Sequence, residues 1–167
     1  MRGHAIFLSG PIGTGKTTLG RALAERLGGE FIDGDGYTDQ TRPWYCSIKR
    51  TSEAIVANGL SALETVPAVV VAYPLGCMNW IYFRRKFGDA GATPLFVSLR
   101  ASYESITNPA RGRVFAPWEH NRIREMIGEG YGARPFSDFV FDTDAGPFDE
   151  TATRLTQAVR ARLAIRP

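Results

Sequence analysis

One short glycine-rich segment constrains the fold of this chain more than any other feature, and it reads GPIGTGKT over residues 10–17. It fits the pattern G-x-x-x-x-G-K-[ST] and stands between an apolar run, His4–Ser9, and a helical pattern, Gly15–Leu27. Glycines let the backbone curl around a phosphate with several N–H groups pointing inward, and the helix N-terminus adds partial positive charge. This segment, which we call the phosphate loop, therefore predicts a nucleotide site in an α/β fold.

The residue types of the phosphate loop predict how it holds a nucleotide. Lys16 is expected to reach the β- and γ-phosphates, and the hydroxyl of Thr17 is expected to hold Mg²⁺. A glycine-rich turn that only packs well would not need this lysine and threonine. No N-K-x-D guanine signature occurs in the chain, so ATP is favoured over GTP. The predicted nucleotide-binding residues are Gly10, Gly13, Thr14, Gly15, Lys16, Thr17, Thr18 and, in a later segment, Arg111.

Short β-branched or aromatic runs alternate with longer helical patterns along the rest of the chain, which is typical of βαβ units and a parallel sheet. The predicted strands are His4–Ser9, Glu30–Asp33, Ala68–Tyr73, Pro94–Leu99 and Phe139–Asp142. The predicted helices are Gly15–Leu27, Ser52–Leu63, Trp80–Phe87, Trp118–Ile127 and Asp149–Leu163. The length of 167 residues suits one α/β domain over residues 1–167.

Composition excludes several classes of protein. A hydrophobic fraction of 44% and a charged fraction of 22% argue against disorder, and the net charge of +3 is too scattered to imply nucleic acid. No apolar stretch approaches the roughly 20 residues that span a bilayer, so we expect a cytoplasmic protein. Cys46 and Cys77 have no metal-ligand spacing and are expected to be buried or idle thiols.

Two carboxylates follow the second predicted strand in the run Phe31-Ile32-Asp33-Gly34-Asp35. The carboxyl ends of parallel strands form the edge where open α/β sheets bind ligands, so this pair should lie beside the phosphate loop. If extended geometry persists through Gly34, both carboxylates point to the same side. One could serve a metal and the other could accept the proton of an acceptor hydroxyl. The alternative is a turn that only closes the strand.

The run from Gly10 to Asp35 resembles the start of the shikimate kinase and gluconate kinase families of small P-loop kinases. The D-G-D form favours the gluconate kinases, and so does Arg42-Pro43-Trp44, which is similar to their D-R-x-P-W segment, with Asp39 as the acidic neighbour. This resemblance implies a three-layer fold: a five-stranded parallel sheet in the order 2-3-1-4-5, with helices on both faces and an arginine-bearing lid. It also implies that Thr17 and Asp33 serve magnesium and that Asp35 contacts the acceptor as catalytic base.

The chain departs from both families around the acceptor. Only Gly36–Thr41 separate D-G-D from the R-P-W segment, which is shorter than in gluconate kinases. Shikimate kinases carry a G-G-G run after the third strand, where this chain has Tyr73-Pro74-Leu75-Gly76-Cys77, which argues against shikimate itself. The pattern Arg50-x-x-Glu53 is similar to their R-x-x-E pair, but it also arises on solvated helices.

Arginines supply the remaining candidates. Arg111 and Arg113 lie in a Gly/Pro-rich stretch at the position of the family's lid, approximately residues 107–117. Lid arginines stabilise the charge of a transferring phosphoryl group, and Arg111 is the first choice; the alternative is a pair of solvated charges. The predicted catalytic residues are thus Lys16, Asp35 and Arg111, and the predicted acceptor-binding residues are Asp35, Arg42, Arg50 and Arg84, near the aromatic residues Tyr73, Trp80 and Tyr82.

Together these features predict an ATP-dependent kinase, monomeric or homodimeric, that phosphorylates a hydroxyl of a small sugar acid or cyclic polyol. A nucleoside or nucleotide kinase stays open because Trp44 and Trp80 could stack on a base. A regulatory ATP-binding NTPase is the alternative from another class, and an RNA-end kinase is disfavoured by the lack of a basic patch. The segment Glu129–Asp138 has no physical explanation from sequence beyond a turn-rich connection.

Overall fold

Five parallel strands form one sheet in the order β2-β3-β1-β4-β5 in the computed structural model, which describes residues 3–144 and 146–165. This order confirms the expected 2-3-1-4-5 arrangement. The strands are β1 His4–Ser9, β2 Glu30–Asp33, β3 Ala68–Ala72, β4 Thr93–Arg100 and β5 Phe139–Asp142. The helices are α1 Lys16–Arg26, α2 Ile48–Ala62, α3 Cys77–Asp89, α4 Tyr103–Ile106, α5 Pro117–Gly128 and α6 Phe148–Ala164.

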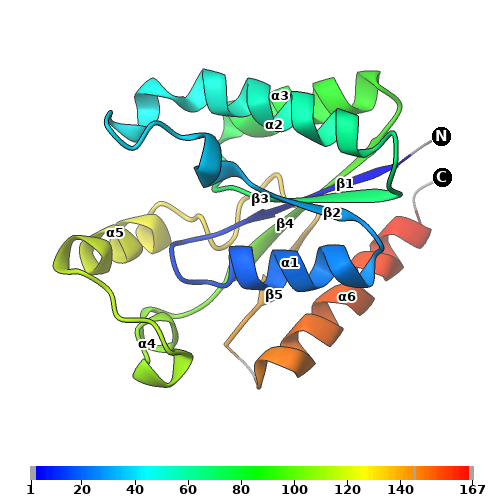
Figure 1. Cartoon of the computed structure of the whole chain (residues 1–167). Helices are drawn as coiled ribbons and strands as arrows, with labels where there is room; N and C mark the ends of the chain where they lie inside the picture. Colours follow the sequence, from blue (N-terminus) through cyan, green and yellow to red (C-terminus); the bar gives the residue numbers. More distant parts are fainter. Residues whose placement is uncertain (1–2, 145, 166–167) are drawn as a thin grey trace.

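Helices cover both faces of the sheet, with α2 and α3 on one side and α1 and α6 on the other (Figure 1). Side chains of β1 alternate between the two interfaces, because successive residues of a strand point to opposite faces. Ile6 and Leu8 join the core under α1 and α6, whereas Ala5 and Phe7 join the core under α2 and α3. Every one of these four residues is fully buried, so the strand that carries the phosphate loop is fixed from both sides.

The elements that sequence missed are short. They are α4 and three 3-10 turns: η1 Gly34–Tyr37, η2 Trp44–Cys46 and η3 Pro109–Arg111. A single turn shows no apolar periodicity, and periodicity is what predicts a helix. The helix predicted from Ser52 begins at Ile48 in the structure as α2. Sequence missed its first turn for the same reason, because that turn carries the exposed Lys49 and Arg50.

The carboxyl ends of the strands meet at one edge, from which the phosphate loop, the D-G-D segment and the segment after β3 all emerge. Cys46 and Cys77 are free and exposed, so of the two expected alternatives, buried or idle thiols, the first is wrong. Within the described residues, no helix is both long and apolar enough to traverse a bilayer.

Candidate active site

The glycines of the phosphate loop are required by its backbone. Gly13 and Gly15 have φ values of 81° and 96°, in the left-handed region that side-chain-bearing residues rarely adopt. Gly10 approaches β4 so closely that an added Cβ would lie 2.6 Å from the carbonyl oxygen of Leu99. The loop therefore wraps tightly over the end of β1 and leads into α1 at Lys16.

Lys16 is held inside the curve of the phosphate loop. Its Nζ donates hydrogen bonds to the carbonyl oxygens of Gly10, at 2.8 Å, and Pro11, at 2.7 Å. Burial lowers the pKa of this ammonium from 10.5 to about 8, against the opposing effect of the Asp35 and Asp33 carboxylates. The lysine is thus a partly desolvated cation beside two carboxylates, positioned to exchange its carbonyl partners for phosphate oxygens.

The two neighbouring threonines Thr14 and Thr17 direct their hydroxyls to different places. The buried Thr14 donates to the carbonyl oxygen of Pro11 at 2.9 Å and so closes the loop on itself. Thr17 lies in the first turn of α1, and its hydroxyl is 3.4 Å from Oδ2 of Asp33 at the end of β2. One hydroxyl and one carboxylate oxygen therefore converge, and such hard oxygen ligands suit Mg²⁺ that also binds phosphates.

The D-G-D segment does not continue as extended chain, so the condition under which both carboxylates would point to the same side is not met. Asp33 ends β2, and its Oδ1 accepts a hydrogen bond from the backbone N–H of Asp35 at 3.2 Å, which starts the 3-10 turn η1. The pKa of Asp35 is raised because surrounding protein desolvates its carboxylate, and the Lys16 ammonium opposes this effect. The turn nevertheless keeps both aspartates within the electrostatic reach of Lys16.

The lid arginines occupy two different positions. Arg111 donates hydrogen bonds to the carbonyl oxygens of Gly13, at 3.3 Å, and Thr143, at 2.9 Å, and so connects the lid to the phosphate loop and to the segment after β5. Arg113 forms an ion pair with Glu119 at 2.7 Å. It is Arg113 that lies near enough to Lys16 to help lower the pKa of that ammonium.

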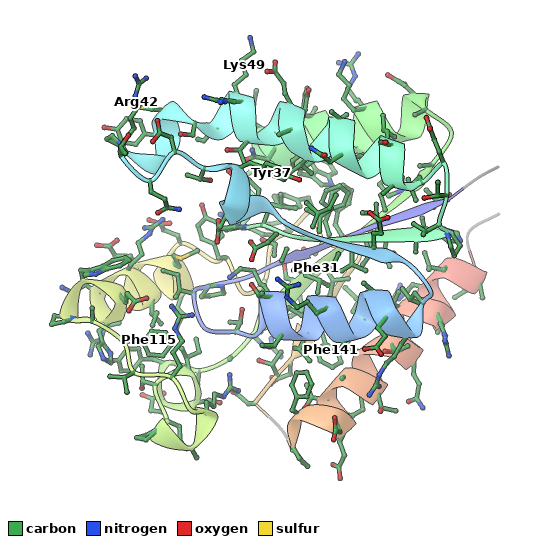
Figure 2. The ribbon with its side chains drawn as sticks, in the orientation of Figure 1. Phe31, Tyr37, Arg42, Lys49, Phe115 and Phe141 are labelled. Atoms are coloured by element: carbon green, nitrogen blue, oxygen red, sulfur yellow. The ribbon has the colours of Figure 1, made fainter. Side chains whose placement is uncertain are left out.

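A small hydrophobic cluster fixes the lid against the phosphate loop. Phe115, labelled in Figure 2, is buried with Ile106 and Ile123, and Ile12 of the phosphate loop packs against them. An added Cβ at Gly13 would lie 2.8 Å from the Phe115 ring. The lid therefore packs directly on the loop that would hold the nucleotide.

The three arginines predicted to bind the acceptor do not gather around Asp35. Arg42 is 72% exposed in its side chain and pairs with Asp39 at 3.6 Å, on the outer end of the segment before α2 (Figure 2). Arg50 is exposed, and its charge helps the hydrogen bonds of Thr41 to lower the pKa of Asp39. Arg84 lies over the ring of Trp80 and lines a separate cavity of about 310 Å³ with Pro94, Phe96, Phe136 and Asp138.

Two tyrosines and an arginine form a series of contacts that begins close to Asp35. Tyr73, directly after β3, is close enough to Asp35 and Tyr131 that both raise the pKa of its phenol, although desolvation is the main cause. The guanidinium of Arg134 stacks 3.7 Å above the ring of Tyr131 and donates to the carbonyl oxygen of Leu75 at 2.9 Å. Tyr131 had no sequence signal, because its role depends on a contact across the fold.

These contacts explain the segment Glu129–Asp138. Arg134 fastens the chain before β5 to the segment after β3, and further hydrogen bonds join this chain to β4. The hydroxyls of Ser137 and Ser98 lie 2.6 Å apart, and the Asp138 carboxylate accepts from the backbone N–H of Phe96 at 2.7 Å. The segment is thus anchored to β4 and to the chain that follows β3, the two strands on either side of β1.

Comparison with known proteins places this arrangement among small kinases. Three curated shikimate kinases align along almost the whole chain: those of Halorhodospira halophila (30% identity, 94% of each chain), Acinetobacter baumannii strain AYE (35%, 92% and 91%) and Acinetobacter baylyi (44%, 92% and 91%). The family described as "ATPase family associated with various cellular activities (AAA)" matches residues 6–66.

Solved structures share the fold. A gluconokinase from Sinorhizobium meliloti superposes with a TM-score of 0.63 at 22% identity, over 97% of this chain and 99% of that one. The Acinetobacter baumannii shikimate kinase in complex with shikimate gives 0.65 at 20% identity, over 96% and 94%.

Proposed function

The chain belongs to the shikimate kinase family and is an ATP-binding small-molecule kinase, and we propose that its acceptor is a hydroxyl group of a cyclic polyol of the shikimate type. The observation that carries the proposed phosphoryl transfer is the position of Asp35, whose carboxylate lies within electrostatic reach of the Lys16 ammonium where the phosphate loop and the D-G-D segment meet, and the similarity to shikimate kinases supports the acceptor class. A base and a phosphate-binding cation at one place are what hydroxyl phosphorylation requires.

In the proposed reaction, Asp35 accepts the proton of the acceptor hydroxyl as its oxygen attacks the γ-phosphorus of ATP. The bond from the γ-phosphorus to the bridging oxygen breaks, and ADP leaves. Lys16 turns from the Gly10 and Pro11 carbonyls to the phosphates, where it stabilises their negative charge. Mg²⁺, held by Thr17 and Asp33, would neutralise charge on the β- and γ-phosphates.

We assign the lid arginines different tasks. Arg113 would contact the transferring phosphoryl group, since its charge lies close enough to Lys16 to help lower the pKa of that ammonium. Arg111 bridges the phosphate loop and the segment after β5, where a bound nucleotide would lie, so it serves ATP binding. Arg42, Arg50 and Arg84 have other described contacts, which favours Asp35 and the residues around Tyr73 as the acceptor site.

A nucleoside kinase gains no support from Trp80, because its ring is stacked on Phe136 at 5.1 Å between centroids and packs edge-on against Phe96. The side chain of Trp44 lies outside the described residues.

The proposal is tested by ADP release from Mg·ATP in the presence of shikimate, other cyclic polyols, gluconate or nucleosides. We expect turnover that depends on shikimate or another cyclic polyol and that is lost in Lys16→Ala. Turnover with gluconate or a nucleoside alone would contradict the proposed acceptor class. ATP hydrolysis that none of these compounds stimulates would favour the regulatory NTPase instead.

A further inference from the structure

Tyr73 lies between the two halves of the candidate site. It follows β3 directly, and its backbone N–H donates to the carbonyl oxygen of Leu8 in β1 at 3.1 Å. The preceding residue, Ala72, pairs with Leu8 on one side and with Asp33 on the other. Tyr73 therefore emerges at the carboxyl edge midway between the strand of the phosphate loop and the strand of the aspartates.

The ring of Tyr73 packs closely against Gly34, the middle residue of the D-G-D segment. A Cβ added to Gly34 would lie 2.5 Å from Cδ2 and 2.8 Å from Cγ of this ring. Real Cβ atoms do not approach carbon atoms so closely, so the ring requires glycine between the two aspartates. The tyrosine after β3 and the glycine of D-G-D are therefore one structural unit, and it fixes the turn that presents Asp35.

The hydroxyl of Tyr73 is left free by this packing. The residue as a whole is only 8% exposed, yet no described group forms a hydrogen bond with its hydroxyl. Among the described residues, the buried side-chain polar atom without a partner is Nδ1 of His4, so the Tyr73 hydroxyl reaches solvent. An unpaired phenol oxygen that reaches solvent close to Asp35 is available to a ligand.

The surroundings keep this phenol protonated. Desolvation, the Asp35 carboxylate and Tyr131 together raise its pKa to about 12. At neutral pH it is thus a neutral donor and acceptor of hydrogen bonds beside the group that we assign as base. When Asp35 is ionised, its carboxylate can only accept hydrogen bonds, whereas the phenol of Tyr73 can also donate one. The two side chains therefore offer complementary hydrogen bonding to a molecule with more than one hydroxyl group.

We propose that Tyr73 is an acceptor-binding residue, and that its hydroxyl forms a hydrogen bond with a second hydroxyl of the acceptor while Asp35 takes the proton of the first. This assignment rests on the proposed function, because it takes Asp35 as the site of phosphoryl transfer. It makes the acceptor a diol or polyol whose hydroxyls are close enough to reach both side chains, rather than a simple alcohol.

The test compares Tyr73→Phe, which keeps the ring on Gly34, with Tyr82→Phe, which removes a phenol from α3 in the same hydrophobic cluster. With shikimate as acceptor, Tyr73→Phe should raise its KM about tenfold, the effect of one hydrogen bond, and leave the KM of ATP and the melting temperature unchanged. Analogues of shikimate that each lack one ring hydroxyl identify the hydroxyl that Tyr73 binds. The analogue without that hydroxyl should have the same KM with the wild type and with Tyr73→Phe. An unchanged KM, or the same change in Tyr82→Phe, would overturn the assignment.

A second measurement separates this proposal from the choice of acceptor. If the wild type binds Mg·ATP but neither shikimate nor another cyclic polyol stimulates ADP release, the proposed acceptor class is wrong, and the polyhydroxy compound that does stimulate release, such as gluconate, then tests Tyr73. Tyr73→Phe should raise the KM of that compound about tenfold at an unchanged KM for ATP, because the phenol would bind a hydroxyl other than the one that reacts. An equal KM in the two proteins would overturn the proposal. So would a fall in kcat accompanied by a shifted acidic limb of the pH profile, since that pattern means that Tyr73 acts only on Asp35.

Discussion

The hydroxyl of Thr17 lies 3.4 Å from Oδ2 of Asp33, across the gap between the first turn of α1 and the end of β2. This contact joins the phosphate loop to the D-G-D segment. Both atoms are hard oxygen ligands, so they can hold one divalent cation from two sides. The loss of either oxygen should therefore weaken the binding of the cation.

We predict that turnover needs Mg²⁺ and that Asp33 and Thr17 set its affinity. Chelation by EDTA should abolish turnover, and added Mg²⁺ should restore it. Asp33→Asn and Thr17→Ala should each raise the Mg²⁺ concentration for half-maximal rate by at least about tenfold. Thr17→Ser keeps the hydroxyl and is the control. An unchanged Mg²⁺ dependence in both variants would mean that residues other than Thr17 and Asp33 bind the metal.

The depressed pKa of Lys16 predicts that nucleotide binding takes up a proton. In the free protein this pKa is about 8, so above that pH the lysine is largely neutral. Bound phosphates favour the charged form and raise the pKa, so the complex retains a proton that the free protein has lost. Affinity for Mg·ADP should therefore decline as pH rises above about 8, with proton uptake seen by calorimetry in buffers of different ionisation enthalpy.

The matched control for this experiment is Lys16→Arg. Arginine stays protonated throughout the accessible pH range, so the variant should bind with no proton uptake near this pH. Equal uptake in wild type and variant would assign the titration to another group.

Asp35 is predicted to be the general base. Asp35→Asn should lower kcat by about 10²-fold or more while Mg·ATP binding changes little. Desolvation raises the pKa of Asp35 above its ordinary value of 3.8, so activity should fall as pH decreases through this raised pKa, at a higher pH than an ordinary carboxylate would give. Steady-state kinetics against pH measures both effects.

Asp39→Asn supplies the control for this series. Its carboxylate is already occupied by the hydroxyl and backbone N–H of Thr41 and by Arg42, and those hydrogen bonds from Thr41 lower its pKa. Its loss should leave kcat intact. A normal rate in Asp35→Asn would require a different base.

Part of this site was predictable from sequence because its chemistry is local. The phosphate loop needs left-handed glycines and a lysine at fixed spacing, and the structure places them together as expected. The strands were equally readable, since β1, β2 and β5 have the predicted bounds. The roles of the individual residues and the single-domain organisation remain predictions.

The rest depended on contacts between distant segments. The chain turns at Gly34 because the Asp33 carboxylate accepts a hydrogen bond from the N–H of Asp35. The sequence D-G-D is compatible with both this turn and an extended chain, so sequence alone could not decide between them. The contact of Arg134 with the carbonyl oxygen of Leu75 joins residues far apart in the chain. No local pattern encodes such a contact, which is why the segment before β5 could not be interpreted.

The two lid arginines are predicted to affect different kinetic constants. Arg113→Ala should lower kcat and kcat/KM together, on the order of 10³-fold, because it removes charge from the transferring phosphoryl group. Arg111→Ala should chiefly raise the KM of ATP, since its contacts are with Gly13 and Thr143. Arg122→Ala, at a half-buried arginine of α5 that pairs with Glu125 and Glu129 and has no described contact with Lys16, is the control. Glu119→Gln removes the charge that pairs with Arg113 but keeps an oxygen that can accept from the backbone N–H of Ala116, so an equal loss of kcat there would indicate that the pair positions the lid.

The last prediction concerns the contact between Gly34 and the Tyr73 ring. Gly34→Ala should lower the free energy of unfolding by roughly 1–3 kcal/mol, because the new methyl group forces the ring or the turn to move. Gly36→Ala lies in the same turn with nothing within 4 Å of an added Cβ, so it should be nearly neutral. Tyr73→Ala removes the ring, and in that background Gly34→Ala should cost much less, which a double-mutant cycle of urea unfolding measures as a coupling energy. If Gly34→Ala is equally destabilising with and without the ring, then its cost comes from the backbone of the D-G-D turn, and Tyr73 is not the reason for glycine at this position.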